Sequence, residues 1–203
     1  MTKHKKLKAI ILANFIMYTG YQLYAPFYAL FAQDIGAYIR TIGFLWSFYS
    51  ILMAIVMLVF GKLENNYSKE KIVVYGFFMY SVGSFAFLLV NNIGSLVLVL
   101  ALNALLGGIT VPAYKTLFTH LQDKDRESEE WSWLEASYMI AISVGSAVGG
   151  IVLSTLGFNG LFIIMGTIQF IAGIIVYKSL KHKITFEGDL LKATSVAKRY
   201  ISR

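Results

Sequence analysis

The sequence predicts an all-α, polytopic membrane protein with six transmembrane helices, and three observations support this fold class. Of the 203 residues, 57% are hydrophobic and 14% are charged, and the mean hydropathy is +0.64. Four long runs contain no charged side chain, and the basic residues gather between those runs. About 25% of residues are charged in soluble domains. The composition therefore excludes a soluble enzyme, a disordered chain and a nucleic-acid-binding domain.

The charge-free runs set the expected number of spans. They cover residues 9–33, 41–61, 72–114 and 136–177. One span needs about 20 predominantly apolar residues, so the first two runs hold one helix each and the last two hold two each. Polar, glycine-containing segments divide the two longer runs. The expected helices are 7–32, 39–61, 70–90, 95–118, 131–156 and 159–180, with outer turns at 91–95 and 157–160.

The basic residues predict the orientation in the membrane. The segments 1–8, 62–71, 115–135 and 178–203 carry 4, 3, 3 and 7 Lys or Arg residues, which is 17 of the 18 in the chain. Basic residues accumulate on the cytoplasmic side of membrane proteins. We therefore expect a plasma-membrane protein with both termini in the cytoplasm.

The chain is expected to divide into a bundle and a tail. Residues 1–180 form the predicted six-helix bundle, and residues 181–203 form a basic cytoplasmic tail. Apolar and basic residues alternate in the tail near helical spacing. An amphipathic helix on the anionic inner leaflet and a frayed terminus are equal alternatives for it.

Small residues predict where helices touch. Without a hydrophobic drive between helices in lipid, close packing needs small side chains at the contact. Two expected helices, 95–118 and 131–156, carry glycines at such spacing. We interpret these as packing positions rather than ligand contacts: Gly107, Gly108, Gly145, Gly149 and Gly150.

The loop after the second expected helix carries a family resemblance. Residues 61–71 resemble the signature G-x-L-x-D-r-x-G-r-k of the major facilitator superfamily, and residues 42–50 and 145–150 resemble the family's helices 2 and 5. Asn65 stands where the family has Asp, and Glu64 is a candidate substitute. The resemblance gives the following residues a gating role: Gly61, Leu63, Glu64, Asn65, Lys69 and Lys71.

The resemblance implies a transporter that moves a small solute by alternating access. The family has twelve helices in two halves, each built from a 3+3 inverted repeat. Pro26 and Pro112, late in expected helices 1 and 4, are placed as such a repeat would pair them. Whether the chain is complete or the first half of a longer protein stays open. A second six-helix half is the expected partner, most simply a second copy in a homodimer, because a lone half would leave polar amides facing lipid.

Two other functions remain open. A substrate-binding subunit of a vitamin-type uptake system also has six helices, although residues 61–71 argue against it, and a copurifying ATPase would favour it. A non-transporting membrane scaffold is the other alternative. It would be favoured if changing the helix 1 amides altered abundance but no solute flux.

The candidate solute-binding residues lie on two helices. Polar groups inside membrane helices face the bundle interior by default, and helical spacing groups those of helices 1 and 4 on one face each. In the resembled family these two helices line the cavity, while helices 3 and 6 are peripheral. A purely structural role between helices is the alternative for the asparagines. The candidates are Asn14, Tyr18, Tyr21, Gln22, Asn103, Thr110 and Tyr114.

Charges near the expected inner boundary complete the predicted site. Glu135 is placed to pair with Lys115 or His120 as an inner gate, with an ordinary interfacial position as the alternative. Proton-coupled members of the family carry an acidic residue in helix 1 and an Arg in helix 4. Here amides occupy those helices, and an amide has no proton to exchange. We expect no cofactor, metal or nucleic acid. The expected partners are the lipid bilayer, a small solute and a second six-helix half.

Overall fold

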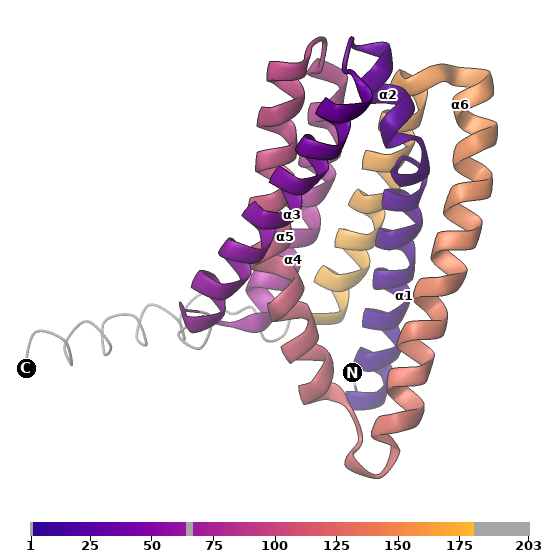
Figure 1. The fold of residues 1–203 in the computed structure, drawn as a ribbon. Helices are drawn as coiled ribbons and strands as arrows, with labels where there is room; N and C mark the ends of the chain where they lie inside the picture. Colours follow the sequence, from indigo (N-terminus) through magenta and orange to yellow (C-terminus); the bar gives the residue numbers. More distant parts are fainter. Residues whose placement is uncertain (1, 64–66, 181–203) are drawn as a thin grey trace, which may run out of the picture.

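A computed structural model describes residues 2–63 and 67–180, and its regular structure there is entirely helical (Figure 1). Glu64 and Asn65 of the predicted gating loop and the tail 181–203 lie outside the described residues. The elements are α1 (Lys3–Gln22), η1 (Ala25–Phe27), α2 (Tyr28–Asp34), α3 (Ile39–Leu63), α4 (Lys69–Phe85), η3 (Ala86–Leu89), α5 (Ile93–Leu121), η4 (Lys124–Arg126) and α6 (Glu127–Leu180).

The predicted first helix, 7–32, is not continuous. It is divided into α1, the short η1 and α2, and Pro26 lies in the first turn of η1. Proline has no N–H, and its ring clashes with the carbonyl of the residue four positions earlier. That residue is Gln22, where α1 ends. Pro112 behaves differently and lies inside α5.

The two predicted outer turns lie where the sequence places them. Asn92 caps α5: its side chain accepts a 2.9 Å hydrogen bond from the Ser95 amide, while the Ser95 hydroxyl accepts one from the Asn92 amide at 3.2 Å. Such a reciprocal cap satisfies amides that the first helical turn leaves open. Gly157, with φ of 66°, interrupts the helical geometry of α6. The two arms of α6 run antiparallel on either side of this bend (Figure 1).

Helix length and composition agree with a membrane location. Within the described residues, four helical segments are long and apolar enough to cross a membrane: Ile39–Lys62, Lys69–Leu89, Ile93–Leu121 and Lys124–Leu180. The last of these contains the bend at Gly157. The all-helical fold class is therefore confirmed, whereas the six-span count and the 3+3 repeat stay predictions.

Glycines permit the closest helix contacts. A Cβ atom on Gly145 would lie 2.7 Å from the carbonyl oxygen of Thr19, and one on Gly149 would lie under 3.0 Å from that of Leu23. In α5, a Cβ on Gly107 would lie 2.5 Å from the Tyr80 hydroxyl, and one on Gly108 would meet Val56 equally closely. Gly150 is less tight, because its nearest neighbour is the Phe27 ring at 3.4 Å.

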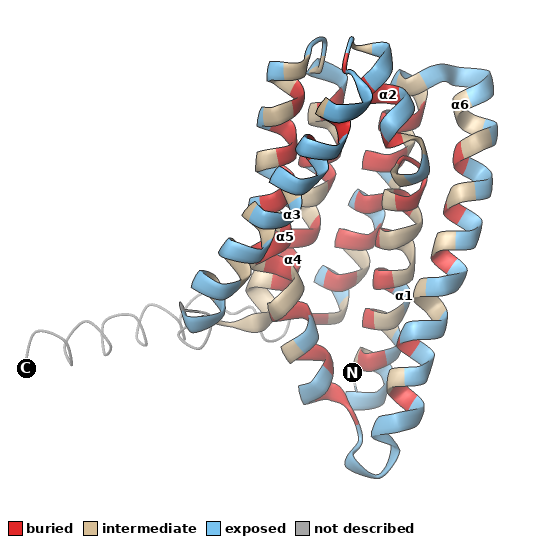
Figure 2. Cartoon of the chain, viewed as in Figure 1, coloured by how far each residue is buried: buried red, intermediate tan, exposed pale blue. Residues whose placement is uncertain are grey.

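α3 is the least covered of the long helices (Figure 2). It packs on α5 and, through its first turns, on α2. Most of its remaining surface is apolar and exposed, including Phe44 at 67% and Leu58 at 73%. α1 and α4 instead pack against α6, and α4 also contacts α5. α1 and α5 touch much less, and the space between them holds the site described next.

Candidate functional site

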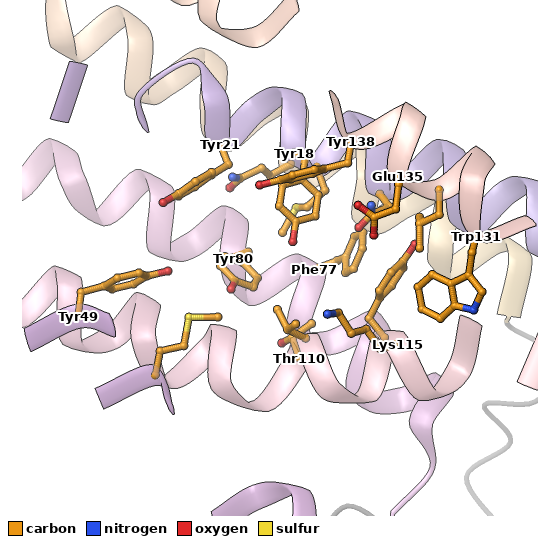
Figure 3. Close-up of a pocket in the computed structure, with 17 residues that line it drawn as sticks. Tyr18, Tyr21, Tyr49, Phe77, Tyr80, Thr110, Lys115, Trp131, Glu135 and Tyr138 are labelled. Atoms are coloured by element: carbon orange, nitrogen blue, oxygen red, sulfur yellow. The ribbon is translucent and has the colours of Figure 1, made fainter. Parts of the chain in front are cut away.

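A cavity of about 380 Å³ lies between α1 and α5, with contributions from α3, α4 and α6 (Figure 3). Its volume falls within the range of about 300–1,000 Å³ typical of small-molecule sites. Five of the seven predicted solute-binding residues line this cavity: Asn14, Tyr18 and Tyr21 from α1, and Thr110 and Tyr114 from α5. The structure thus brings these five together, and their role in binding stays a prediction.

Gln22 and Asn103 do not line this cavity. Successive residues turn by about 100° around a helix, so Gln22 points about 80° away from Asn14, and its Cβ instead packs where a Gly145 Cβ would lie. Asn103 donates hydrogen bonds to the carbonyl oxygens of Val99 at 2.9 Å and Gly83 at 3.3 Å. It also lines a second, smaller cavity of about 30 Å³. The alternative of a structural role fits Asn103 better than contact with a solute in the large cavity.

Two hydroxyls of the cavity wall have no partner. The hydroxyls of Thr110 and Tyr114 are buried, and neither makes a hydrogen bond within the part of the chain that the structure describes. Their side chains are 3% and 7% exposed. A buried donor without a partner costs about 1–3 kcal/mol. Both groups lie on one face of α5, and the Thr110 side chain packs against Gly76 of α4, where an added Cβ atom would lie under 3.0 Å from it.

One positive and one negative charge face the cavity. Lys115 of α5 and Glu135 of α6 line it, and the other lining residues are uncharged. Figure 3 shows the two side chains directed into the same space from different helices. Within the described residues they form no ion pair with each other, and Glu135 forms none with His120. The closed inner gate predicted for them is therefore not present in this conformation.

Aromatic rings form much of the wall. Tyr18 and Tyr138 meet edge to face, with ring centres 4.6 Å apart and planes at 85°. Phe77 and Tyr114 lie 6.2 Å apart between centres. Trp131 adds an indole close to the charged end (Figure 3). Such rings offer flat apolar surface together with phenol groups that exchange hydrogen bonds.

The expectation that helices 3 and 6 are peripheral is wrong for the site. Phe77 and Tyr80 of α4 line the cavity, and so does Gln169 from the second arm of α6. Gln169 is 1% exposed and accepts a hydrogen bond from the Ser84 hydroxyl. Gln169 is an amide inside the expected helix 159–180, so the default that polar groups in membrane helices face the bundle interior predicts its position. Tyr49 and Met53 of α3 also line the cavity, and their sequence context gives no such signal.

The expectation that polar amides of a lone half would face lipid is also wrong. Asn14, Gln22 and Asn103 are 5%, 9% and 9% exposed within the single chain. α4 and α6 pack closely enough to enclose them without a partner. The burial of these amides therefore removes one reason for predicting a second half, and that prediction needs support from other features. Among the described residues, no group of His, Asp or Glu is close enough to hold a metal ion.

The fold defines a helical membrane protein, and its helices surround a cavity of small-molecule size. The sequence pattern of the Major Facilitator Superfamily matches residues 10–195. The chain therefore belongs to this superfamily of integral membrane proteins, and the resemblance found at residues 61–71 is confirmed.

Relatives and a solved structure agree with this assignment. The chain is 23% identical to an uncharacterised MFS-type transporter of Methanocaldococcus jannaschii over 87% of this chain and 46% of that protein. It is 20% identical to the quinolone resistance protein NorA of Staphylococcus aureus over 72% of this chain and 38% of that one. The crystal structure of the POT family transporter PepTSo has a similar fold, with a TM-score of 0.72 and 16% identity, over 87% of this chain and 37% of that one. The chain spans less than half the length of these proteins.

Proposed function

We propose that the chain forms one half of a membrane transporter that moves a small solute by alternating access. The cavity between α1 and α5 carries this proposal, because it combines solute-sized volume with two unpartnered hydroxyls and two unpaired charges. Membership of the superfamily supports it, since its members bind solute between two halves. Six spans, an inverted repeat and cytoplasmic termini belong to the same proposal.

The solute is proposed to be amphipathic. Aromatic side chains from α1, α4 and α6 surround the cavity, and polar groups interrupt them at few places. An apolar wall with few placed polar groups selects ligands that carry both kinds of surface. The relative named for quinolone resistance supports this class. A fluorescent quinolone such as norfloxacin is therefore a suitable first probe.

A second half is proposed to cover α3. Phe44, Ile51 and Leu58 of this helix are more than half exposed, and its Tyr49 and Met53 line the cavity. A second copy of the chain is the simplest partner, because closed two-fold dimers are the commonest assemblies of identical chains. A strictly monomeric protein in lipid nanodiscs that still moves solute would contradict the pairing.

Reconstitution into proteoliposomes tests transport directly. We expect norfloxacin to equilibrate across the membrane several times faster with the protein than in empty liposomes. Absence of flux for norfloxacin, together with lower abundance on changing α1 amides, would favour the scaffold. Copurification of an ATPase required for flux would favour the uptake subunit.

Reporter fusions test the proposed topology. A reporter placed after residue 92 or 158 should map outside the cell, and one placed after residue 68, 127 or 190 should map inside. The reason is the preference of basic residues for the cytoplasmic side, which carries 17 of the 18 Lys and Arg residues in this arrangement. Finding residues 115–135 outside would contradict the six-span arrangement.

Transport should not be driven by protons through α1. The described part of the cavity contains one carboxylate, that of Glu135, and α1 contributes amide and phenol groups. We therefore expect norfloxacin flux in proteoliposomes to stay the same when a pH gradient is imposed. Proton-driven accumulation that disappears in Glu135→Gln would overturn this expectation and make Glu135 the proton carrier.

A further inference from the structure

The cavity wall is chemically divided between two helices. α5 presents hydrogen-bond donors: the Thr110 and Tyr114 hydroxyls, and the ammonium group of Lys115. Thr110 and Tyr114 are four residues apart and lie on one side of the helix. Lys115 directly follows Tyr114 and projects about 100° further around the helix. α6 presents the opposite chemistry, because the carboxylate of Glu135 only accepts hydrogen bonds.

The hydroxyls of Thr110 and Tyr114 on α5 lack a hydrogen-bond partner among the described residues. Both are buried and unpaired in the described chain, and buried hydroxyls are rarely left so. Lys115 does not neutralise Glu135 across the cavity. A carboxylate beside α5 would accept from the Lys115 ammonium group, and charge-assisted hydrogen bonds of this kind are the strong ones. An ammonium beside α6 would pair with Glu135.

The rings lie close to both charged groups. Figure 3 shows Tyr18, Tyr138 and Phe77 close to Glu135, and Trp131 at the same end of the cavity as Lys115 and Glu135. An aromatic ring of a solute could pack against these residues by its edge or its face. The wall therefore provides a cationic donor side, an anionic side and aromatic surface.

We propose that this cavity selects zwitterionic aromatic solutes of the amino-acid type, with the carboxylate on the α5 side at Lys115 and the ammonium at Glu135. This inference names the solute class of the transporter proposed above and rests on the same cavity. Lys115 and Glu135 are both exposed at the cavity, so a zwitterion is attracted at both of its ends, whereas a solute with one charge is attracted at one end only.

Four probes with a shared phenylalkyl skeleton test the proposal: L-phenylalanine, phenethylamine, 3-phenylpropionate and 3-phenylpropanol. Binding to the full chain in lipid nanodiscs is measured by calorimetry and by quenching of Trp131 fluorescence, with Trp131→Phe identifying its signal. We expect L-phenylalanine to bind about tenfold more tightly than each of the other three.

Charge variants give the sharper result. Glu135→Gln should shift the preference to 3-phenylpropionate, and Lys115→Gln should shift it to phenethylamine, each with about a tenfold loss for L-phenylalanine. The exchange Lys115→Glu with Glu135→Lys should restore binding of L-phenylalanine at least in part. Glu127→Gln and Lys124→Gln change exposed charges outside the cavity and should leave all four affinities unchanged.

The outcomes separate this inference from transport itself. Selective binding of L-phenylalanine without any flux would leave the inference standing and remove the proposed function. Equal affinity for all four probes, binding of none of them by folded protein, or the same order of probe affinities in both charge variants would overturn the inference, whether or not norfloxacin is transported. Thermal unfolding of each variant establishes that it is folded.

Discussion

Gly149→Ala is expected to lower the free energy of unfolding by about 2–3 kcal/mol. The new Cβ atom would lie under 3.0 Å from the carbonyl oxygen and Cα of Leu23. These are backbone atoms at the end of α1, which faces this part of α6. Backbone cannot rotate away as a side chain does, so α1 and α6 must separate. The thermal midpoint and the denaturation profile of the protein in detergent measure the loss.

The next residue of the same helix provides the control. A Cβ on Gly150 meets the Phe27 ring at 3.4 Å, which is an ordinary contact. Alanine also favours helix over glycine by about 0.8–1 kcal/mol. Gly150→Ala should therefore leave stability unchanged or raise it slightly. Equal destabilisation by the two substitutions would show that the close approach of α1 and α6 is not what Gly149 provides.

The sequence predicts the helical segments well because lipid imposes a simple requirement. A span must be about 20 residues long and nearly free of charge, and the runs without charge satisfy this from one end to the other. Turn chemistry then locates the ends, as in the Asn92 cap and the positive φ of Gly157. The break after Gln22 is not predicted by the hydrophobic pattern, because apolar residues continue across Pro26 and only the proline itself signals the break.

The site is predicted in part, because periodicity gives directions around one helix but not the neighbours. Asn14, Tyr18 and Tyr21 share a face and reach the cavity together. Asn103 shares a face with Thr110, yet lies about 10 Å further along the axis, where Gly83 of α4 approaches and takes its hydrogen bond. Gln169 and Tyr80 enter the cavity through the packing of α4 on α6, which local sequence does not encode.

Two buried asparagines should respond oppositely to the same substitution. Asn14 lines the cavity and makes no hydrogen bond with another side chain or carbonyl in the described chain, so Asn14→Leu removes a polar group that is available to solute. We expect norfloxacin flux in proteoliposomes to fall about tenfold or more, in line with the loss of one placed hydrogen-bonding group. The thermal midpoint should not fall, because leucine suits a buried wall.

Asn103→Leu should show the reverse pattern. Its amide donates to Val99 at 2.9 Å and to Gly83 at 3.3 Å and is 9% exposed, so the substitution breaks a link between α5 and α4. Interhelical hydrogen bonds in membranes contribute about 0.6–2 kcal/mol, and a loss of this size should appear in the unfolding free energy. Flux per folded molecule should stay near that of the unmodified chain, because the amide does not reach the large cavity. Loss of flux in Asn103→Leu with normal stability would instead place Asn103 on the solute path. Retained flux in Asn14→Leu would remove Asn14 from that path.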